Sequence, residues 1–297
     1  DYARYAANGN GLFGTHTTLP LSLSKTANMR YFINFQGFVN YNRTFGEKHE
    51  VDAFISYFNE NMMKNGDLPY DRLSLMGHLK YGYGSRYYIQ GDFTYDGTEQ
   101  FKPGNRFKFF PTVSAAWVVS NESFLKDSGW LSFLKIRASA GWLGNDQISA
   151  TRFLYATDVR YQLQGYLLSN YYAAQTVEGM QGNPYIHYEK SFQQNYGIDI
   201  TLLNSLSFTF DYWNVKQTNM AIQDNSISSA QGIASNYLPF ENLGKMNNKG
   251  FDVELSYTKK LKCGLNMTFR GNMGYNKNEV IDVKELNRTT SGYYYPY

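Results

Sequence analysis

The feature that most constrains this chain is an alternation of apolar and polar residues that persists through long segments. The stretch NKGFDVELSYTKKLKCGLNMTFRGNMGYNKN, residues 248–278, shows it on both sides of a short basic break. Its apolar positions are Phe251, Val253, Leu255 and Tyr257 on the first limb and Leu265, Met267, Phe269, Met273 and Tyr275 on the second. Because successive side chains of a strand point to opposite faces, this stretch predicts a hairpin whose two faces meet different surroundings.

About ten segments of this kind follow one another along the chain. Their apolar rows lie within residues 31–41, 51–57, 73–83, 87–95, 107–119, 136–142, 196–202, 206–212, 251–257 and 265–275. Segments of about ten residues exceed the five or six that are typical of strands in globular proteins, and they match a tilted strand that crosses a bilayer. The chain is therefore predicted to be all-β, with about ten strands of an antiparallel transmembrane β-barrel.

The connections between these segments alternate in length. Short breaks are expected at residues 43–47, 84–85, 204–205 and 259–263, and longer ones at 59–70, 97–106, 143–187 and 218–247. Outer-membrane barrels have short turns on the periplasmic side and longer loops outside, whereas a soluble sandwich has no reason to sort its loops in this way. One exception, residues 120–133, occupies a short position but could hold a helical turn capped by Ser120 or Asn121.

Composition excludes several other classes of protein. Aromatic residues make up 18% of the chain, with 27 Tyr and 21 Phe, as suits the interfacial girdles of a membrane barrel. Mean hydropathy is −0.50, and no apolar run approaches the ~18 residues that a spanning helix needs. The net charge of +3 is spread along the chain, so nucleic-acid binding is not expected.

No constellation of residues predicts catalysis. The four histidines, His16, His49, His78 and His187, are widely separated, and the sequence contains no nucleophile elbow, phosphate-binding loop or paired-cysteine motif. The single cysteine, Cys263, cannot form a disulfide within the chain. The protein is therefore expected not to be an enzyme and to hold neither a metal ion nor a cofactor.

Two long connections are candidates for contact with a ligand. Residues 143–187 combine many tyrosines with glutamine and asparagine, and residues 96–106 carry several polar side chains. Aromatic rings and amides would stack on and hydrogen-bond to a sugar or a peptide; the alternative is that they pack the loop on itself or against a lid. The candidates are Tyr161, Tyr166, Tyr171 and Tyr172 in the first connection and Asp96, Glu99 and Gln100 in the second.

The polar rows of the predicted strands are too rich in charge for a packed core. They are expected to line a wide or plugged lumen and to contact a plug or one another. The charged members of interest are Arg137, Asp199, Asp211, Asp252, Glu254 and Arg270. Some positions break the pattern by placing a phenylalanine on a polar row: Phe32, Phe38, Phe54 and Phe110.

Several long stretches resemble one family. They are YYIQGDFTYDGTEQF (87–101), FFPTVSAAWVVSNESFLKD (109–127), WLSFLKIRASAGWLGN (130–145), GNPYIHYEKSFQQNYGIDITLLNSLSFTFDYWNVKQTNM (182–220) and ENLGKMNNKGFDVEL (241–255). In order and spacing they are similar to motifs of the SusC/RagA-like TonB-linked outer-membrane transporters of Bacteroidetes-type bacteria. The family's DGS motif reads Asp96-Gly97-Thr98 here.

The resemblance implies a barrel of about 22 strands with a plugged lumen, located in the bacterial outer membrane and embedded in its lipid. It implies active import of oligosaccharides or oligopeptides, driven through TonB together with a SusD-like surface lipoprotein, and it allows a dimer of transporter–lipoprotein pairs. No plug, TonB box or C-terminal family strand is recognised, so residues 1–297 are expected to be the middle part of one barrel domain. The alternatives are a passive pore, a structural or secretion-complex barrel, and a soluble ligand-binding β protein.

Overall fold

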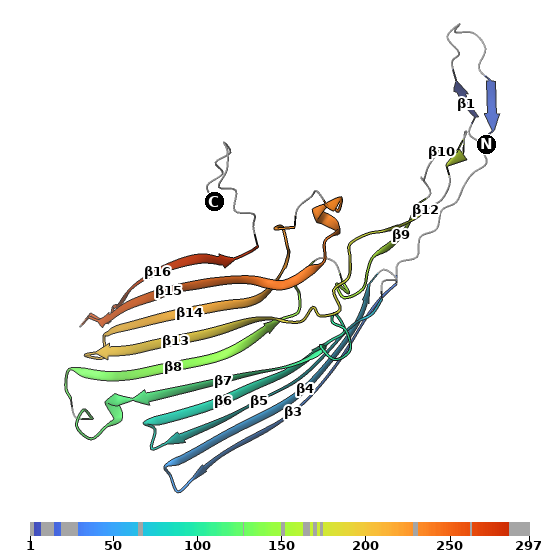
Figure 1. The fold of residues 1–297 in the computed structure, drawn as a ribbon. Helices are drawn as coiled ribbons and strands as arrows, with labels where there is room; N and C mark the ends of the chain where they lie inside the picture. The colour runs from blue at the N-terminus through green and yellow to red at the C-terminus, as the bar shows by residue number, and fades with distance from the viewer. Residues whose placement is uncertain are drawn as a thin grey trace.

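The structure is a computed structural model that describes residues 3–6, 15–18, 29–64, 68–126, 128–149, 152–162, 167–168, 171–172, 175–227, 231–261 and 263–284. Ten long strands in it form one antiparallel sheet (Figure 1). They are β3 (Arg30–Phe45), β4 (His49–Lys64), β5 (Tyr70–Tyr83), β6 (Tyr87–Thr98), β7 (Phe107–Val118), β8 (Leu131–Asn145), β13 (Glu189–Leu202), β14 (Leu206–Gln223), β15 (Phe240–Lys260) and β16 (Asn266–Asp282). The ten predicted segments are thus confirmed as strands.

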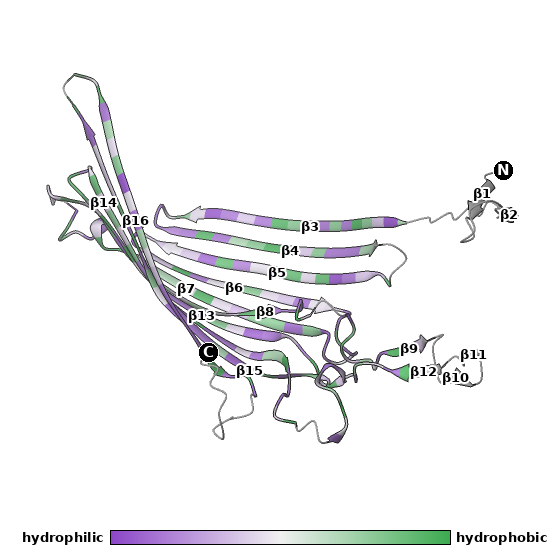
Figure 2. Cartoon of the chain, turned by 90° about the horizontal axis from the view of Figure 1, so that it is seen from above, coloured by the Kyte–Doolittle hydropathy of each residue, from purple (hydrophilic) through white to green (hydrophobic). Residues whose placement is uncertain are grey.

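Each long strand pairs with the next long strand along the chain, from β3 to β8 and then from β13 to β16. The sheet is twisted and curved, as the two views in Figures 1 and 2 show. Three small strand pairs accompany it: β1 (Ala3–Ala6) with β2 (Thr15–Thr18), β9 (Val159–Gln162) with β12 (Gln175–Glu178), and β10 (Leu167–Leu168) with β11 (Tyr171–Tyr172). These short strands lack an extended apolar row, and the sequence did not predict them.

Short turns gather at one end of the sheet. The β5–β6 turn uses Gly84 and Ser85, and the β13–β14 turn uses Leu203 and Asn204, all with φ between 51° and 57°. Positive φ at both central residues is what a tight hairpin of right-twisted strands requires, and glycine and asparagine adopt it at low cost. The predicted separation of short turns from long connections is confirmed, because the described residues within 99–106, 146–188 and 224–239 belong to connections at the opposite end of the strands.

The described part of the connection between β7 and β8 contains one 3-10 turn, η1 (Val119–Asn121). The expected cap is wrong, since Ser120 and Asn121 lie inside this turn and its first residue has no side-chain cap. Asn121 donates instead from Nδ2 to the backbone oxygen of Ser85, 2.7 Å away. A second 3-10 turn is η3 (Ser235–Tyr237). None of the helices in the described ranges is long and apolar enough to cross a membrane.

The two faces of the sheet differ as the alternation predicts, and Figure 2 shows the resulting bands along each strand. The apolar face presents exposed side chains such as Phe35, Leu79 and Ile89, which are 63%, 58% and 54% exposed. On the opposite, polar face, Ser56 and Ser74 are buried at 1% and 3%. A barrel wall is expected to have these properties, with lipid on one side and a filled lumen on the other.

Two of the phenylalanines that break the pattern, Phe38 and Phe54, form local contacts on the polar face, whereas Phe32 is exposed. Phe38 stacks on Phe54, with ring centroids 6.4 Å apart, and Phe54 stacks on His78 at 5.6 Å. His78 in turn places Nε2 3.1 Å from Oδ1 of Asp52. Phe110 instead enters a buried cluster at the long-loop end.

Candidate functional site

The long connections fold together at one end of the sheet. We call this assembly the loop platform and define it as residues 99–106, 146–158, 179–188 and 231–239 where the structure describes them. A buried cluster holds the platform on the sheet and consists of Phe101, Phe110, Leu154, Ile186 and Tyr188. Each fully buried side chain of this size contributes roughly 1.5–3 kcal/mol, so the platform is a folded part of the protein and not a set of independent loops.

Tyr188 is the polar member of this cluster. Its ring centroid lies 4.7 Å from that of Phe101, and its hydroxyl donates a 3.1 Å hydrogen bond to the backbone oxygen of Arg106. Burial raises the pKa of Tyr188 far above its ordinary range. The phenol therefore stays neutral and serves as a hydrogen-bond donor within the platform.

Two asparagines join the platform connections through backbone groups. Asn183 donates from Nδ2 to the backbone oxygen of Phe240 at 2.8 Å. Asn242 donates from Nδ2 to the backbone oxygens of His187, at 2.9 Å, and Asn219, at 2.7 Å, while its Oδ1 accepts from the backbone N–H of His187 at 3.0 Å. These two residues begin the Asn183-Pro184 and Asn242-x-Gly244 motifs. Their amides hold the β14–β15 connection against the segment that leads into β13.

Arg152 links three further parts of the platform. Its guanidinium donates to the backbone oxygens of Leu68 and Pro69, at 2.5 and 2.7 Å, and Nη2 lies 2.9 Å from Oε1 of Glu99. Burial is the main cause that raises the pKa of Glu99, and the charge of Arg152 opposes this effect. Arg152 thus compensates a partly buried carboxylate while it fixes the connection before β5.

The predicted contact residues at the end of β6 and in the connection that follows it all have partners within the protein. Asp96 accepts a hydrogen bond from Ser74 and lies 3.7 Å from Nη2 of Arg72. Gln100 accepts a 3.4 Å hydrogen bond from the backbone N–H of Phe153. Together with Glu99, these groups lie at the junction between strand β6 and the loop platform.

Of the predicted tyrosines, Tyr161 lies elsewhere, on the arm formed by β9 and β12. This arm extends away from the ends of the long strands (Figure 1). Tyr161 on β9 is 69% exposed. Tyr171 and Tyr172 form β11, whose side chains are not described, and Tyr166 lies outside the described residues. The structure therefore separates the two groups of candidates that the sequence had proposed together.

On the polar face, three of the predicted charged residues meet across neighbouring strands. Arg137 on β8 lies 3.2 Å through Nε from Oδ2 of Asp199 on β13, and 2.7 Å through Nη2 from Oδ2 of Asp211 on β14. The guanidinium crosses β13 directly above Gly197, where a Cβ would lie 2.6 Å from Cζ of Arg137. The glycine two residues before Asp199 therefore leaves the space that the ion pairs occupy.

A second contact on this face involves the Asn-Lys-Gly motif of β15. Trp213 on β14 donates from Nε1 to Oδ2 of Asp252 at 2.9 Å. Its indole lies over Gly250, where a Cβ would be 2.7 Å from the ring and 2.2 Å from the backbone oxygen of Tyr275. The other two predicted residues, Glu254 and Arg270, are exposed on β15 and β16 and form no ion pair with any described residue.

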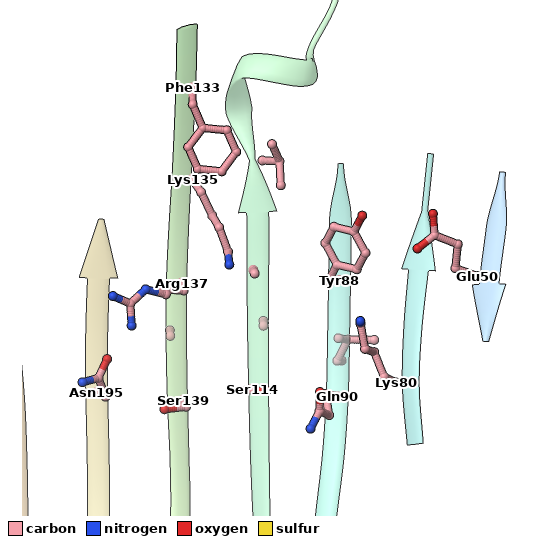
Figure 3. A pocket seen from close by; sticks show the side chains of 15 residues that line it. Glu50, Lys80, Tyr88, Gln90, Ser114, Phe133, Lys135, Arg137, Ser139 and Asn195 are labelled. Carbon is pink, nitrogen blue, oxygen red and sulfur yellow. The ribbon is translucent and has the colours of Figure 1, made fainter. Parts of the chain in front are cut away.

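A hollow of about 570 Å³ lies in the polar face beside these residues (Figure 3). Its polar lining comes from five adjacent strands and includes Lys80, Tyr88, Gln90, Ser114, Lys135, Arg137, Ser139 and Asn195, with Glu50 at one side. Nζ of Lys80 lies 5.6 Å from the ring centroid of Tyr88. Three cations and one carboxylate line the hollow, but Arg137 is already paired with Asp199 and Asp211. The hollow can therefore accept a hydrogen-bonding chain without a strong preference for its charge.

A clamp at the short-turn end connects the start of β6 with the end of β7. Glu122, 7% exposed, accepts hydrogen bonds from the hydroxyl of Tyr87 and, at 3.1 Å, from Nε1 of Trp117, and it pairs with Nη1 of Arg86 at 2.9 Å. The hydrogen bond from Tyr87 is the main cause that holds the pKa of Glu122 below its ordinary range, followed by the bond from Trp117. Trp117, in the family-like stretch 109–127, thus has a local structural role.

Sequence reasoning missed Arg152, the platform amides and the lining of the hollow as a group. Alternation places Lys80, Lys135 and Arg137 on one face, but only the strand pairing shows that they surround one space. The sequence signal for Asn183 and Asn242 was their position within the family-like stretches 182–220 and 241–255. No group of three or more metal-ligating side chains occurs among the described residues.

The comparisons with known proteins decide the family. A family model described as "TonB dependent receptor-like, beta-barrel" matches residues 1–297. The chain belongs to this family. Its members are receptors of the bacterial outer membrane and not enzymes, which confirms the predicted barrel fold, location and absence of enzyme activity.

Individual relatives support the same assignment. The chain is 27% identical to TonB-dependent receptor P3 of Formosa agariphila, over 77% of this chain and 21% of that protein. It is 26% identical to TonB-dependent receptor SusC of Bacteroides thetaiotaomicron, over 71% of this chain and 21% of SusC. The chain thus spans about a fifth of the length of these relatives.

Among solved structures, the chain is similar to one titled "Structure of the RagAB peptide transporter", with a TM-score of 0.72 at 23% identity. The match covers 86% of this chain and 31% of that one. At this identity the similarity shows the fold alone, which is that of a barrel wall.

Proposed function

We propose that the protein takes part in active import of oligomeric nutrients across the outer membrane, with energy supplied through TonB. The observation that carries this proposal is the continuous polar face of ten neighbouring strands, combined with the match of the whole chain to TonB-dependent receptor barrels. A polar wall with a hollow of this size suits the passage of a hydrogen-bonding chain. The loop platform then stands at the outer mouth, because the long loops of such barrels face the cell exterior.

The proposed transporter needs more strands than the described sheet provides. The outermost strands, β3 and β16, each pair with a long strand on one side only. Unpaired backbone groups are costly within a bilayer, where no water can satisfy them. We therefore propose that residues 1–297 are part of one barrel domain, whose further strands and plug belong to a longer chain.

A surface lipoprotein of the SusD type is the proposed partner at the outer mouth. The relatives named SusC and RagAB motivate this proposal, and the exposed arm formed by β9 and β12 supplies a surface for contact. We propose that Tyr161, Tyr166, Tyr171 and Tyr172 contact either the cargo or this partner. TonB would act through a segment outside this chain, and two transporter–lipoprotein pairs could form a dimer.

The proposed cargo is an oligopeptide or an oligosaccharide. The RagAB structures are titled as those of a peptide importer and transporter. Aromatic rings and amides suit both classes of cargo, so the experiment must compare them.

The test uses the full chain purified from outer membranes in detergent, with co-purifying proteins identified by peptide mass. Uptake of labelled oligopeptides and oligosaccharides is then measured in cells with and without TonB. The proposal expects a longer chain with a plug, a co-purifying lipoprotein, and uptake of one cargo class that is lost without TonB. Uptake that persists without TonB would indicate a passive pore, and absence of uptake would indicate a structural or secretion role.

A further inference from the structure

The apolar face changes character at the long-loop end of the last four strands. On β13, β15 and β16 an aromatic residue is followed on the same face, one position further toward the loops, by a lysine. The pairs are Phe192 with Lys190, Phe251 with Lys249, and Tyr275 with Lys277. On β14, Tyr212 is followed by Asn214 and then Lys216. We call the four lysines the lysine band.

The strand register makes the band continuous. Lys249 lies directly opposite Lys277 across β15 and β16. Lys216 pairs with Asn247, so it is a diagonal neighbour of Lys249, and Lys190 pairs with Thr218, so it is a diagonal neighbour of Lys216. Diagonal neighbours across antiparallel strands lie about 7–8 Å apart, within the reach of lysine side chains.

The band runs parallel to the line of short turns. From β13 to β16 it moves four residues closer to the turns, since Lys277 is level with Gln194 on β13 and Lys190 lies four residues beyond. The turn ends of the same strands shift in the same direction, since Leu202 and Leu206 are level with Tyr257 while β15 continues to Lys260. Counted along each strand, the four lysines lie ten to twelve residues from the turn end, at Leu202, Leu206, Lys260 and Asn266. The band therefore keeps a nearly constant height above the turns, as a feature of the membrane interface would.

The charges of the band are not neutralised within the described residues. Lys216, Lys249 and Lys277 are exposed, Lys190 is half-exposed, and none of the four is within ion-pair distance of a described carboxylate. On this face Glu279 lies opposite Asn247, and Asp282 lies opposite a further lysine, Lys245, so a net charge of +3 remains. Like charges directly opposite each other destabilise a sheet, so an external anion would relieve the repulsion between Lys249 and Lys277.

We propose that the lysine band binds phosphorylated lipid headgroups of the outer leaflet. The band lies just beyond the aromatic residues that mark the interface, on the lipid side of the wall and at the outer end of the strands. Clustered lysines beside a bilayer attract anionic headgroups. The band is confined to β13–β16, since the loop-proximal outward positions on β3–β8 include Asn59, Asn61 and Asp71 but no lysine. One sector of the barrel would thus hold a shell of charged lipid.

The experiment measures phosphorylated lipid retained by the full chain after extraction from outer membranes, by native mass spectrometry. The first variant is Lys249→Gln. In two further variants all four lysines of the band are replaced, by glutamine in one and by arginine in the other. Each variant is used only if it shows the heat-modifiable mobility of a folded barrel. The control is Lys259→Gln, because Lys259 lies on the same face of the same strand at the turn end. We expect about fivefold weaker lipid retention for Lys249→Gln and a greater loss when all four lysines are replaced by glutamine. The variant with four arginines and the control Lys259→Gln should retain lipid normally.

Reconstitution with native lipopolysaccharide, with its dephosphorylated form and with inorganic phosphate identifies the ligand. The proposal expects retention of the native lipid, weak retention of the dephosphorylated form and no competition by millimolar phosphate. Equal retention of the two lipid forms, or equal losses for Lys249→Gln and Lys259→Gln, would overturn it. If the fourfold glutamine variant fails to fold, Lys249→Gln against Lys259→Gln decides the question. Because lipid retention does not depend on import, this test is independent of the proposed function.

Discussion

At the scale of single residues, glycines of the polar face leave room for side chains that cross from neighbouring strands. The two cases differ in what a methyl group would meet. Above Gly197 it would meet the end of the Arg137 side chain, which can move, whereas above Gly250 it would meet the backbone oxygen of Tyr275 at 2.2 Å. The glycine of the Asn-Lys-Gly motif is therefore the less replaceable one.

Replacing Gly250 by alanine should lower the free energy of unfolding by about 1–3 kcal/mol, because neither the backbone nor the indole of Trp213 can yield without strain. Gly197→Ala should have a smaller effect. The measurement is the temperature at which the folded band converts to the unfolded band on a gel. Gly271→Ala is the control, since nothing lies within 4 Å of a Cβ at that position. Equal transitions for the Gly250 and Gly271 variants would contradict this explanation.

Glu122 should make the turn clamp sensitive to acid. Its pKa in the folded protein is held below the ordinary value of 4.5. The clamp therefore contributes its full stability above that value and loses it as pH falls through the lower, folded pKa. Thermal transitions measured from pH 7 to pH 3 should converge for the wild type and Glu122→Gln in acid. A constant difference between the two proteins across this range would be inconsistent with the proposed ionised clamp.

At the scale of elements, the loop platform depends on side-chain amides that donate hydrogen bonds to backbone oxygens where no neighbouring strand does so. Asn242→Ala would leave the backbone oxygens of His187 and Asn219 without their donor, at a cost of about 1–3 kcal/mol. We expect faster proteolysis of the connections at the surface of intact cells, with an unchanged thermal transition of the barrel. Asn225→Ala, at an exposed position in the β14–β15 connection, is the control. Equal cleavage rates for both variants would argue against the role of Asn242.

The arm of β9 and β12 should be separable from the platform. Replacing residues 161–176 by Asn-Gly would close a tight hairpin between Arg160 and Val177, which are paired in the structure. We expect an unchanged thermal transition, together with reduced uptake or reduced recovery of the lipoprotein. If both uptake and recovery of the lipoprotein are unaffected, the arm tyrosines do not contact the cargo or the partner.

Alternation predicted the long strands because each face of a membrane-spanning strand meets one uniform environment. It placed their ends too early, since β14 continues to Gln223 and β15 begins at Phe240, inside the expected loop 218–247. Beyond the bilayer both faces are polar, so strand pairing persists while the pattern disappears. The platform could not be predicted, because Arg152 and Asn242 contact segments far away in sequence and show no local pattern of their own.

At the scale of the whole molecule, charge is distributed differently on the two sides of the wall. The polar face carries ion pairs such as those of Arg137, while the lysine band on the apolar face is uncompensated. The inner Arg137 is neutralised by its two carboxylate partners, whereas the outer lysines remain available to a surrounding phase. This asymmetry is why the two proposals, for import and for lipid, rest on separate surfaces.

The strand order also sets a sequence of assembly. Every long strand pairs with its neighbour along the chain, and the connections range from short turns to residues 146–188, the longest, which separate β8 from β13. Short-range pairing forms quickly, whereas closing a long segment carries a larger entropy cost. The wall should therefore form as two blocks, β3–β8 and β13–β16, which join last. The loop platform lies above that seam, and its buried cluster would hold the two blocks together once they have met.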